Sequence, residues 1–276
     1  MQKNIFKKIE SYLDYAVELE TNLTAIPAVD PSSGGDGEFE KANYLESELK
    51  KLKFDEILRI DAPDKRVKSK VRPNIVARYK GQNSSKTFWI MTHLDIVPPG
   101  DLKLWKTDPY KLLREGNKIY GRGTEDNQQG LVASILAVKA MMETGYRPPV
   151  DIVLLFIADE EVGEGYGIDY LLKNKNELFG KKDIFLTPDG GNARGNAISV
   201  SEKSLIWLKF IVTGKQCHAS TPHVGINPVT ASSKLMCKLE EKLREKYNAK
   251  DKLFNPPIST FVPTKREVAK VSINTI

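Results

Sequence analysis

The sequence predicts an α/β fold in which a mostly parallel sheet is flanked by helices. Strand-like and helix-like segments alternate through residues 1–196 of the 276-residue chain. One of them, Asp151–Ile157 (DIVLLFI), is apolar except for its first residue, which is typical of a strand buried on both faces. Clusters of carboxylates follow several strand-like segments. In open α/β folds such clusters meet at one edge of the sheet, where ligands bind.

The first third of the chain contains two predicted helices and three predicted strands. An opening amphipathic helix is indicated by helical spacing of apolar residues, namely Ile5, Ile9, Leu13, Val17 and Leu19. Asp30–Gly37 is a loop rich in Pro, Gly and Ser, and a second helix covers about Glu38–Leu52. The strands are expected over Glu56–Ile60, Asn74–Tyr79 and Thr87–Met91.

The middle of the chain continues the alternation. A long apolar helix is predicted over Gln128–Thr144, ended by Gly145. The strand Asp151–Ile157, a short helix over Gly167–Asn174 and a strand over Asp183–Thr187 follow. This order favours a largely parallel sheet with helices on both faces.

The pattern changes near residue 197, which predicts a second domain over residues 197–276. Two strands are expected there at Ala197–Glu202 and Ser204–Thr213, then a helix over Asn227–Tyr247 and a strand over Val268–Ile273. A β-β-α-β unit of this kind is half of a small α+β domain.

Composition excludes several classes of protein. The net charge of +6 is spread along the chain, and its densest stretch, Lys65–Arg72, lacks interleaved aromatics, so we expect no nucleic-acid partner. Cys217 and Cys237 are too few and too distant for a disulfide framework, which fits a reducing cytoplasm. Met1–Glu20 is charged and unlike a signal peptide, and no segment approaches the ~20 apolar residues of a membrane span. We therefore expect a cytoplasmic protein with no membrane partner.

The polar clusters predict a metal site. His93 and Asp95 are two residues apart in an extended segment, so both side chains point to the same side. Glu160 and Glu161 are adjacent carboxylates that repel each other, and a cation relieves that repulsion. One of the two can ligate a metal while the other acts as a base. Taken alone, His93 fits a packed or surface histidine, and Asp126 and Asp189 fit ordinary loop acids; together they favour a metal site.

Five ordered motifs resemble a known family. The motifs are THLD at Thr92–Asp95, GRGTED followed by Gly130, ADEEVGEGYG at Ala158–Gly167, PDGG at Pro188–Gly191, and GKQCHASTPHVGINP at Gly214–Pro228. They are similar to those of the two-metal amidohydrolases. This family includes succinyl-diaminopimelate desuccinylase, acetylornithine deacetylase, aminoacylase, carboxypeptidase G and carnosinase-type dipeptidases.

The resemblance implies a role for each site residue. His93 and Asp189 would ligate one metal, Glu161 the other, and Asp126 would bridge both. Glu160 would be the general base and Asp95 would support His93. His218 would reach the partner subunit's site to polarise the scissile carbonyl, and Asn274 would contact substrate.

The resemblance also implies an activity and partners. The expected reaction is hydrolysis of an amide bond in a small N-acyl amino acid or a dipeptide. Two divalent ions are expected, zinc before cobalt or manganese. Residues 1–196 would form a zinc-peptidase-like catalytic domain, and residues 197–276 part of a lid domain through which a homodimer forms.

Several features depart from the family pattern. Asn127-Gln128-Gln129 stands where many members have Met-Lys-Gly, which removes a positive charge near the site. Cys217 replaces a usual Gly, and Asp rather than Glu at 189 favours the dipeptidase branch. The family's second ligand histidine would follow the lid, so we expect a chain truncated at its C-terminus.

Two alternatives remain open from the sequence. The chain could be a catalytically impaired fragment that binds metal or pairs with a subunit without turnover. It could also be a one-domain zinc aminopeptidase, although the motif at Gly214–Pro228 argues against that reading.

Overall fold

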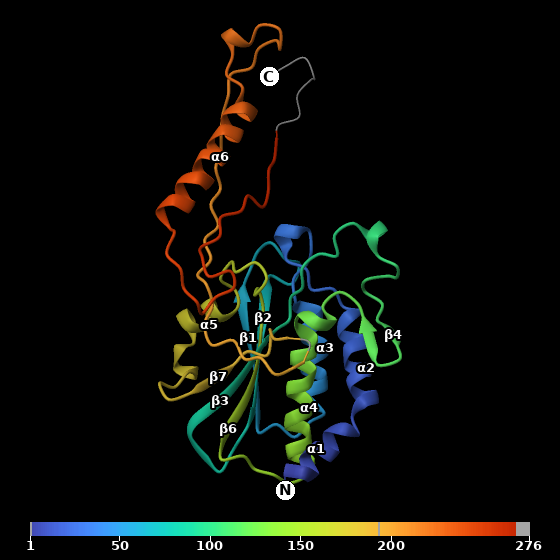
Figure 1. Cartoon of the computed structure of the whole chain (residues 1–276). Coiled ribbons are helices and arrows are strands. Elements are labelled where there is room, and N and C mark those ends of the chain that lie inside the picture. Colours follow the sequence, from blue (N-terminus) through green and yellow to red (C-terminus); the bar gives the residue numbers. More distant parts are fainter. Residues whose placement is uncertain (1, 193, 269–276) are drawn as a thin grey trace. The chain divides into compact units, whose positions relative to one another are not determined.

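The structure is a computed structural model that describes residues 2–192 and 194–268 (Figure 1). The chain divides into two compact units, Met1–Ala197 and Ile198–Ile276. Each unit has its own secondary structure.

The first unit is built on a five-stranded mixed sheet with the strand order β1-β2-β6-β3-β7. Strand β2 is antiparallel to both β1 and β6, whereas β3 is parallel to β6 and β7. All strands except β2 therefore run in one direction, and the predicted mostly parallel sheet is confirmed. The strands are β1 Glu56–Pro63, β2 Val71–Tyr79, β3 Asn83–His93, β6 Val150–Ile157 and β7 Ile184–Leu186.

Helices cover both faces of this sheet (Figure 1). Strand β6 shows why: Ile152, Leu154 and Phe156 pack among the helices α1 to α4, while Val153, Leu155 and Ile157 pack on the side of α5. Each buried side chain of this size contributes roughly 1.5–3 kcal/mol. The helices are α1 Gln2–Glu10, α2 Leu13–Thr24, α3 Phe39–Lys50, α4 Gln129–Glu143 and α5 Ile168–Asn174. In the part of the chain that the structure describes, no helix has both the length and the apolar character to span a membrane.

Short elements connect the main ones. A two-stranded hairpin, β4 with β5, precedes a π-helical turn that leads into α4. The short elements of this unit are η1 Pro31–Ser33, η2 Leu102–Leu104, β4 Leu113–Glu115, β5 Lys118–Tyr120, η3 Thr124–Gln128 and η4 Asn176–Leu178.

The predicted opening helix is wrong in one respect, because it is broken into α1 and α2. The Ser11 hydroxyl donates to the Lys8 carbonyl (2.6 Å), and α2 begins at Leu13. The break turns Tyr12 inward, where its hydroxyl donates to Glu143 on α4 (2.8 Å). Leu13, assigned by periodicity to the apolar face, is exposed as a result.

The second unit contains the turn η5 (Pro222–Val224) and the helix α6 (Pro228–Lys246). The Asn227 side chain caps α6 by accepting from the backbone N–H groups of Val229 and Thr230, and the predicted helix is confirmed. The predicted strands over residues 197–202 and 204–213 are wrong, because these segments pair with no neighbouring strand within the described residues. Alternating apolar residues favour a strand, but a strand also needs a hydrogen-bonded neighbour. The strand predicted over 268–273 lies outside the described residues apart from Val268.

Candidate metal centre

Three parallel strands end at one edge of the sheet. Strand β3 ends at His93, β6 at Ile157 and β7 at Leu186. His93 lies opposite Ile157 in the sheet register, and the Leu94 N–H donates to the Ile157 carbonyl (2.8 Å). The segments that follow these strands therefore leave the sheet together, as the sequence predicts for parallel strands.

His93 lies at the centre of a cluster of side chains. Its imidazole is buried, and Nε2 is 2.9 Å from Asp126 Oδ1 and 3.5 Å from Asp189 Oδ2. One ligand atom from each of the three residues lies within 4.8 Å of the others. One imidazole nitrogen and two carboxylate oxygens at this spacing suit a single divalent ion of the zinc, cobalt or manganese type.

Asp126 reaches the cluster from outside the main sheet. It follows the β4–β5 hairpin, in the turn before α4, and not a strand of the main sheet. The Asn127 amide donates to the Pro188 carbonyl (3.1 Å), which ties this turn to the loop that carries Asp189. A Cβ atom on Gly130 would lie 2.4 Å from the same carbonyl oxygen, so only glycine permits this approach.

Asp95 connects His93 to the turn that carries the two glutamates. Its carboxylate accepts from the backbone N–H groups of Glu160 (3.1 Å) and Glu161 (2.9 Å), and its Oδ1 is 3.4 Å from His93 Nδ1. The Asp95 backbone carbonyl is 3.0 Å from the same Nδ1 atom. Burial disfavours the ionised form, but His93 and the two N–H groups hold the pKa of Asp95 below its usual value.

The electrostatics of the cluster favour a cation. Burial raises the pKa of Glu160, and burial followed by the charge of Asp126 raises the pKa of Glu161 to about 7. Burial opposes a charge on His93, yet hydrogen bonds with Asp189 and Asp95 raise its pKa to about 11. These shifts have the cause expected where several carboxylates share one desolvated site.

Buried polar residues that sequence reasoning missed support the turn that carries Glu160 and Glu161, called the glutamate turn below. The Glu38 carboxylate accepts from the Asp159 N–H (3.2 Å) and forms a buried ion pair with Arg72. The Asn74 side chain accepts from the Ala158 N–H (3.1 Å). The available signal was Asn74, a polar residue at the start of the predicted strand Asn74–Tyr79, whereas Arg72 reads as the end of the charged stretch Lys65–Arg72.

The remaining predicted site residues, His218 and Asn274, belong to the second unit. His218 is exposed in the second unit, where its Nδ1 accepts from the Ser220 N–H (3.2 Å). Asn274 lies outside the described residues.

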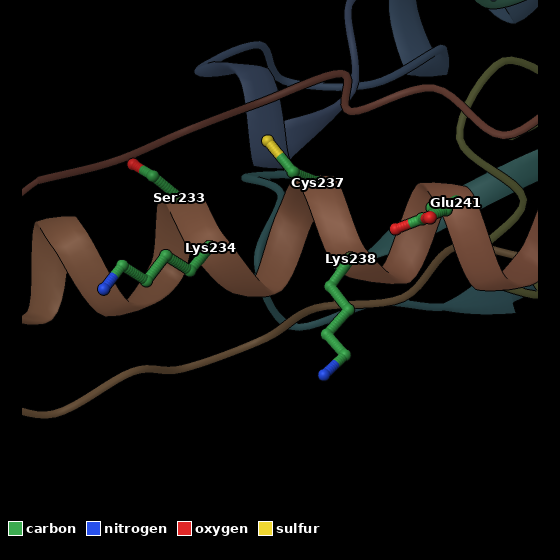
Figure 2. Close-up of a pocket in the computed structure, with 5 residues that line it drawn as sticks. All are labelled: Ser233, Lys234, Cys237, Lys238 and Glu241. Carbon is green, nitrogen blue, oxygen red and sulfur yellow. The ribbon is translucent and has the colours of Figure 1, made fainter.

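A hollow on α6 involves none of the predicted site residues. Figure 2 shows that the side chains lining it all come from this one helix and do not converge on one point. They are Ser233, Lys234, Cys237, Lys238 and Glu241. This hollow is therefore not the candidate site.

Comparison with known proteins agrees with the geometry. Residues 89–264 match the profile of Peptidase family M20/M25/M40. An uncharacterized metallohydrolase of Methanococcus maripaludis is 41% identical over 97% of this chain and 66% of its own length. A succinyl-diaminopimelate desuccinylase of Pelagibacter ubique is 28% identical over 94% of this chain and 62% of its own length. This chain thus spans about two thirds of the relatives it matches.

Two solved structures are similar in fold. The dipeptidase Dug1p of Saccharomyces cerevisiae has a TM-score of 0.58 at 28% identity, covering 68% of this chain and 40% of that protein. The metallo-carboxypeptidase Sso-CP2 of Sulfolobus solfataricus has a TM-score of 0.59 at 24% identity, covering 80% of this chain and 48% of that protein. The second likeness concerns the fold alone.

Proposed function

Because this chain belongs to peptidase family M20/M25/M40, we propose that it hydrolyses amide bonds in small N-acyl amino acids or dipeptides with the help of divalent metal ions. The observation that carries the proposal is the cluster of His93, Asp126 and Asp189, whose ligand atoms lie within reach of one ion. The desuccinylase and dipeptidase names among the similar proteins support the two substrate classes.

The proposed centre holds two ions, zinc before cobalt or manganese. His93 and Asp189 would hold the first, Glu161 the second, and Asp126 would bridge them. Among the neighbouring charges, that of Asp126 raises the pKa of Glu161 the most. This fits a position of Asp126 between the ligands of the two ions. Bound divalent ions lower the pKa of a water molecule and polarise a carbonyl group.

Glu160 would move the proton in this reaction. It is exposed, so water and substrate can reach it, while its backbone N–H is held by buried Asp95. The raised pKa of Glu160 lies closer to neutral pH than that of an ordinary glutamate. A carboxylate with such a pKa can accept a proton from water and return it to the leaving amine. Asp95 would keep both His93 and the glutamate turn oriented.

Two further parts of the proposal concern the second unit. His218 would donate a hydrogen bond to the developing oxyanion at the partner subunit's site. The Ser220 N–H donates to Nδ1, which favours the tautomer with the proton on Nε2. Asn274 would contact the substrate, and the homodimer would form through residues 197–276, where Ile198, Val200 and Ile206 are exposed.

A hydrolysis assay tests the proposal. The full chain would be loaded with Zn²⁺, Co²⁺ or Mn²⁺ and given a panel of N-acyl amino acids and dipeptides, with release of the amine as the readout. We expect turnover by the parent chain and a loss of roughly 10²–10⁴-fold in Glu160→Gln, which keeps its metal. Metal binding by the parent chain without turnover on any substrate would contradict the proposed hydrolase and favour the fragment that binds metal without catalysis.

A further inference from the structure

Asp159 has a backbone conformation that is uncommon for a residue other than glycine. Its φ angle is +59°, in the left-handed region, and it lies directly before Glu160 and Glu161. The Cβ atom disfavours this region, although Asp and Asn enter it more readily than other residues. Strained conformations of this kind persist where the surrounding structure holds them, and they cluster at functional sites. The contacts of Asp159 and its neighbours explain this conformation.

Four consecutive backbone N–H groups, from residue 158 to residue 161, each donate to a side-chain oxygen of another segment. The acceptors are Asn74 for Ala158 (3.1 Å), Glu38 for Asp159 (3.2 Å), and Asp95 for both Glu160 (3.1 Å) and Glu161 (2.9 Å). Neighbouring N–H groups converge on one anion where the backbone passes through a turn or a left-handed conformation. Strand β6 ends at Ile157, so the chain must change direction at once to aim two N–H groups at Asp95.

The Asp159 side chain closes the loop that follows. Its exposed fraction is 4%, and its Oδ2 accepts from the Tyr166 N–H (2.9 Å). Asn74 closes the same loop from strand β2, because its Nδ2 donates to the Tyr166 carbonyl (3.0 Å) while its Oδ1 accepts from the Ala158 N–H. Residues 159–166 therefore form a loop whose two ends are fixed to each other.

The second carboxylate oxygen of Asp159 shows which property of the residue the loop uses. Oδ1 is buried and has no hydrogen-bond partner among the described residues. Side-chain oxygens of Asp30, Asp159 and Glu164 lie within 4.8 Å of one another. An Asn side chain would keep one acceptor for the Tyr166 N–H and offer an amide nitrogen to these acidic neighbours. The loop thus uses the acceptor and the conformation of Asp159, and not its charge.

We propose that Asp159 is a positioning residue for the glutamate turn. Its left-handed backbone directs the N–H groups of Glu160 and Glu161 at the Asp95 carboxylate. Its side chain fixes this conformation by closing the loop at Tyr166. The two glutamates are then held in place before any metal binds. The consequence for metal binding rests on the proposed function, whereas the order of the turn in metal-free protein does not.

The test separates the backbone of Asp159 from its side chain in the full chain. Asp159→Asn keeps the acceptor and the tolerance of a positive φ, Asp159→Gly keeps only the tolerance, and Asp159→Ala keeps neither. The main readout is hydrogen exchange of the Glu160 and Glu161 amides in metal-free protein, resolved by NMR. The second is Zn²⁺ affinity, measured by competition with a chromophoric chelator.

Two further variants serve as controls. Lys70→Ala makes the same kind of change at an exposed residue, which is the other non-glycine position with a positive φ (63°) among the residues that the structure describes. Ile135→Val removes a buried methyl group in the middle of α4 and lowers the stability of the fold without touching the glutamate turn. A role of Asp159 in overall stability alone would leave local opening of the turn as unaffected as it is in Ile135→Val.

We expect Asp159→Ala to speed exchange at Glu160 and Glu161 at least about tenfold, because it loses a buried acceptor and strains the left-handed backbone. Its Zn²⁺ affinity should fall by about 10–100-fold, the usual cost of losing a group behind a metal ligand. Asp159→Gly should lose less than Asp159→Ala in both readouts, because glycine adopts a positive φ without strain. Asp159→Asn and both controls should match the parent.

The proposal is overturned if Asp159→Ala exchanges these amides no faster than Ile135→Val, or if Asp159→Asn is as impaired as Asp159→Ala. Equal exchange in Asp159→Gly and Asp159→Ala would overturn the role of the backbone conformation. A parent chain that binds no Zn²⁺ would remove the proposed function, while the exchange rates in metal-free protein would still decide the role of Asp159.

Discussion

Asp95 shows how a single residue can organise the proposed centre. Its two carboxylate oxygens accept from consecutive N–H groups, those of Glu160 and Glu161, and its carbonyl lies beside His93 Nδ1. The sequence predicts only the link to His93, since spacing within one strand is visible there. The link to the glutamates depends on the pairing of β3 with β6, which no local pattern contains.

The pKa shifts of the cluster predict that metal binding releases protons. A ligand must lose its proton to bind an ion, and the pKa values of His93 and Glu161 are about 11 and about 7. Zn²⁺ therefore displaces a proton from His93 throughout pH 6–8, and from Glu161 in a fraction that falls as the pH rises. Zn²⁺ affinity should increase from pH 6 to pH 8.

Titration calorimetry in two buffers of different ionisation enthalpy measures this release. We expect at least one proton to be released at pH 7 when the centre is filled, and more at pH 6. Affinity that is independent of pH, with no proton released, would contradict the assignment of His93 and Glu161 as ligands.

At the scale of elements, a strand with a long apolar run can be predicted from the sequence, whereas a very short strand cannot. Strand β6 was predictable because residues 152–157 form a continuous apolar run, and all of them are buried in the structure. The hairpin β4–β5 was not, because strands of three residues are too short to show alternation. The predicted strands over residues 197–213 failed for the opposite reason, since their alternation is clear but the described residues offer them no pairing partner.

The approach of α4 to the Asp189 loop yields a prediction at this scale. Gly130→Ala would place a Cβ atom 2.4 Å from the Pro188 carbonyl oxygen, so the start of α4 and the loop must move apart. Overpacking of this kind costs about 1–3 kcal/mol. Because the shift separates Asp126 from Asp189, we expect Zn²⁺ affinity to fall about tenfold or more, as measured by chelator competition.

Gly191→Ala is the matched control for this change. It lies in the same loop, and an added Cβ atom meets no other atom within 4 Å. Its Zn²⁺ affinity should equal that of the parent chain. Equal affinities for both variants would show that the close approach at Gly130 does not position the two aspartates.

At the scale of the whole molecule, the site follows from the direction of the strands. Residues as distant as His93 and Asp189 meet because β3 and β7 are parallel and end at the same edge. This much could be predicted from strand ends that carry polar residues. The buried support could not, because Glu38 and Arg72 are defined by tertiary burial, and in a sequence each reads as an ordinary surface charge.

The central claim is that His93, Asp126 and Asp189 hold a divalent ion, and a Zn²⁺ binding isotherm of the full chain tests it most directly. The parent would be compared with His93→Ala and with His223→Ala, an exposed histidine of the second unit that serves as the control. We predict a high-affinity Zn²⁺ site in the parent and in His223→Ala. In His93→Ala the Zn²⁺ affinity should fall by more than the roughly 10–100-fold that follows the loss of a residue that only hydrogen-bonds to a metal ligand. Unchanged high-affinity binding in His93→Ala would contradict the account.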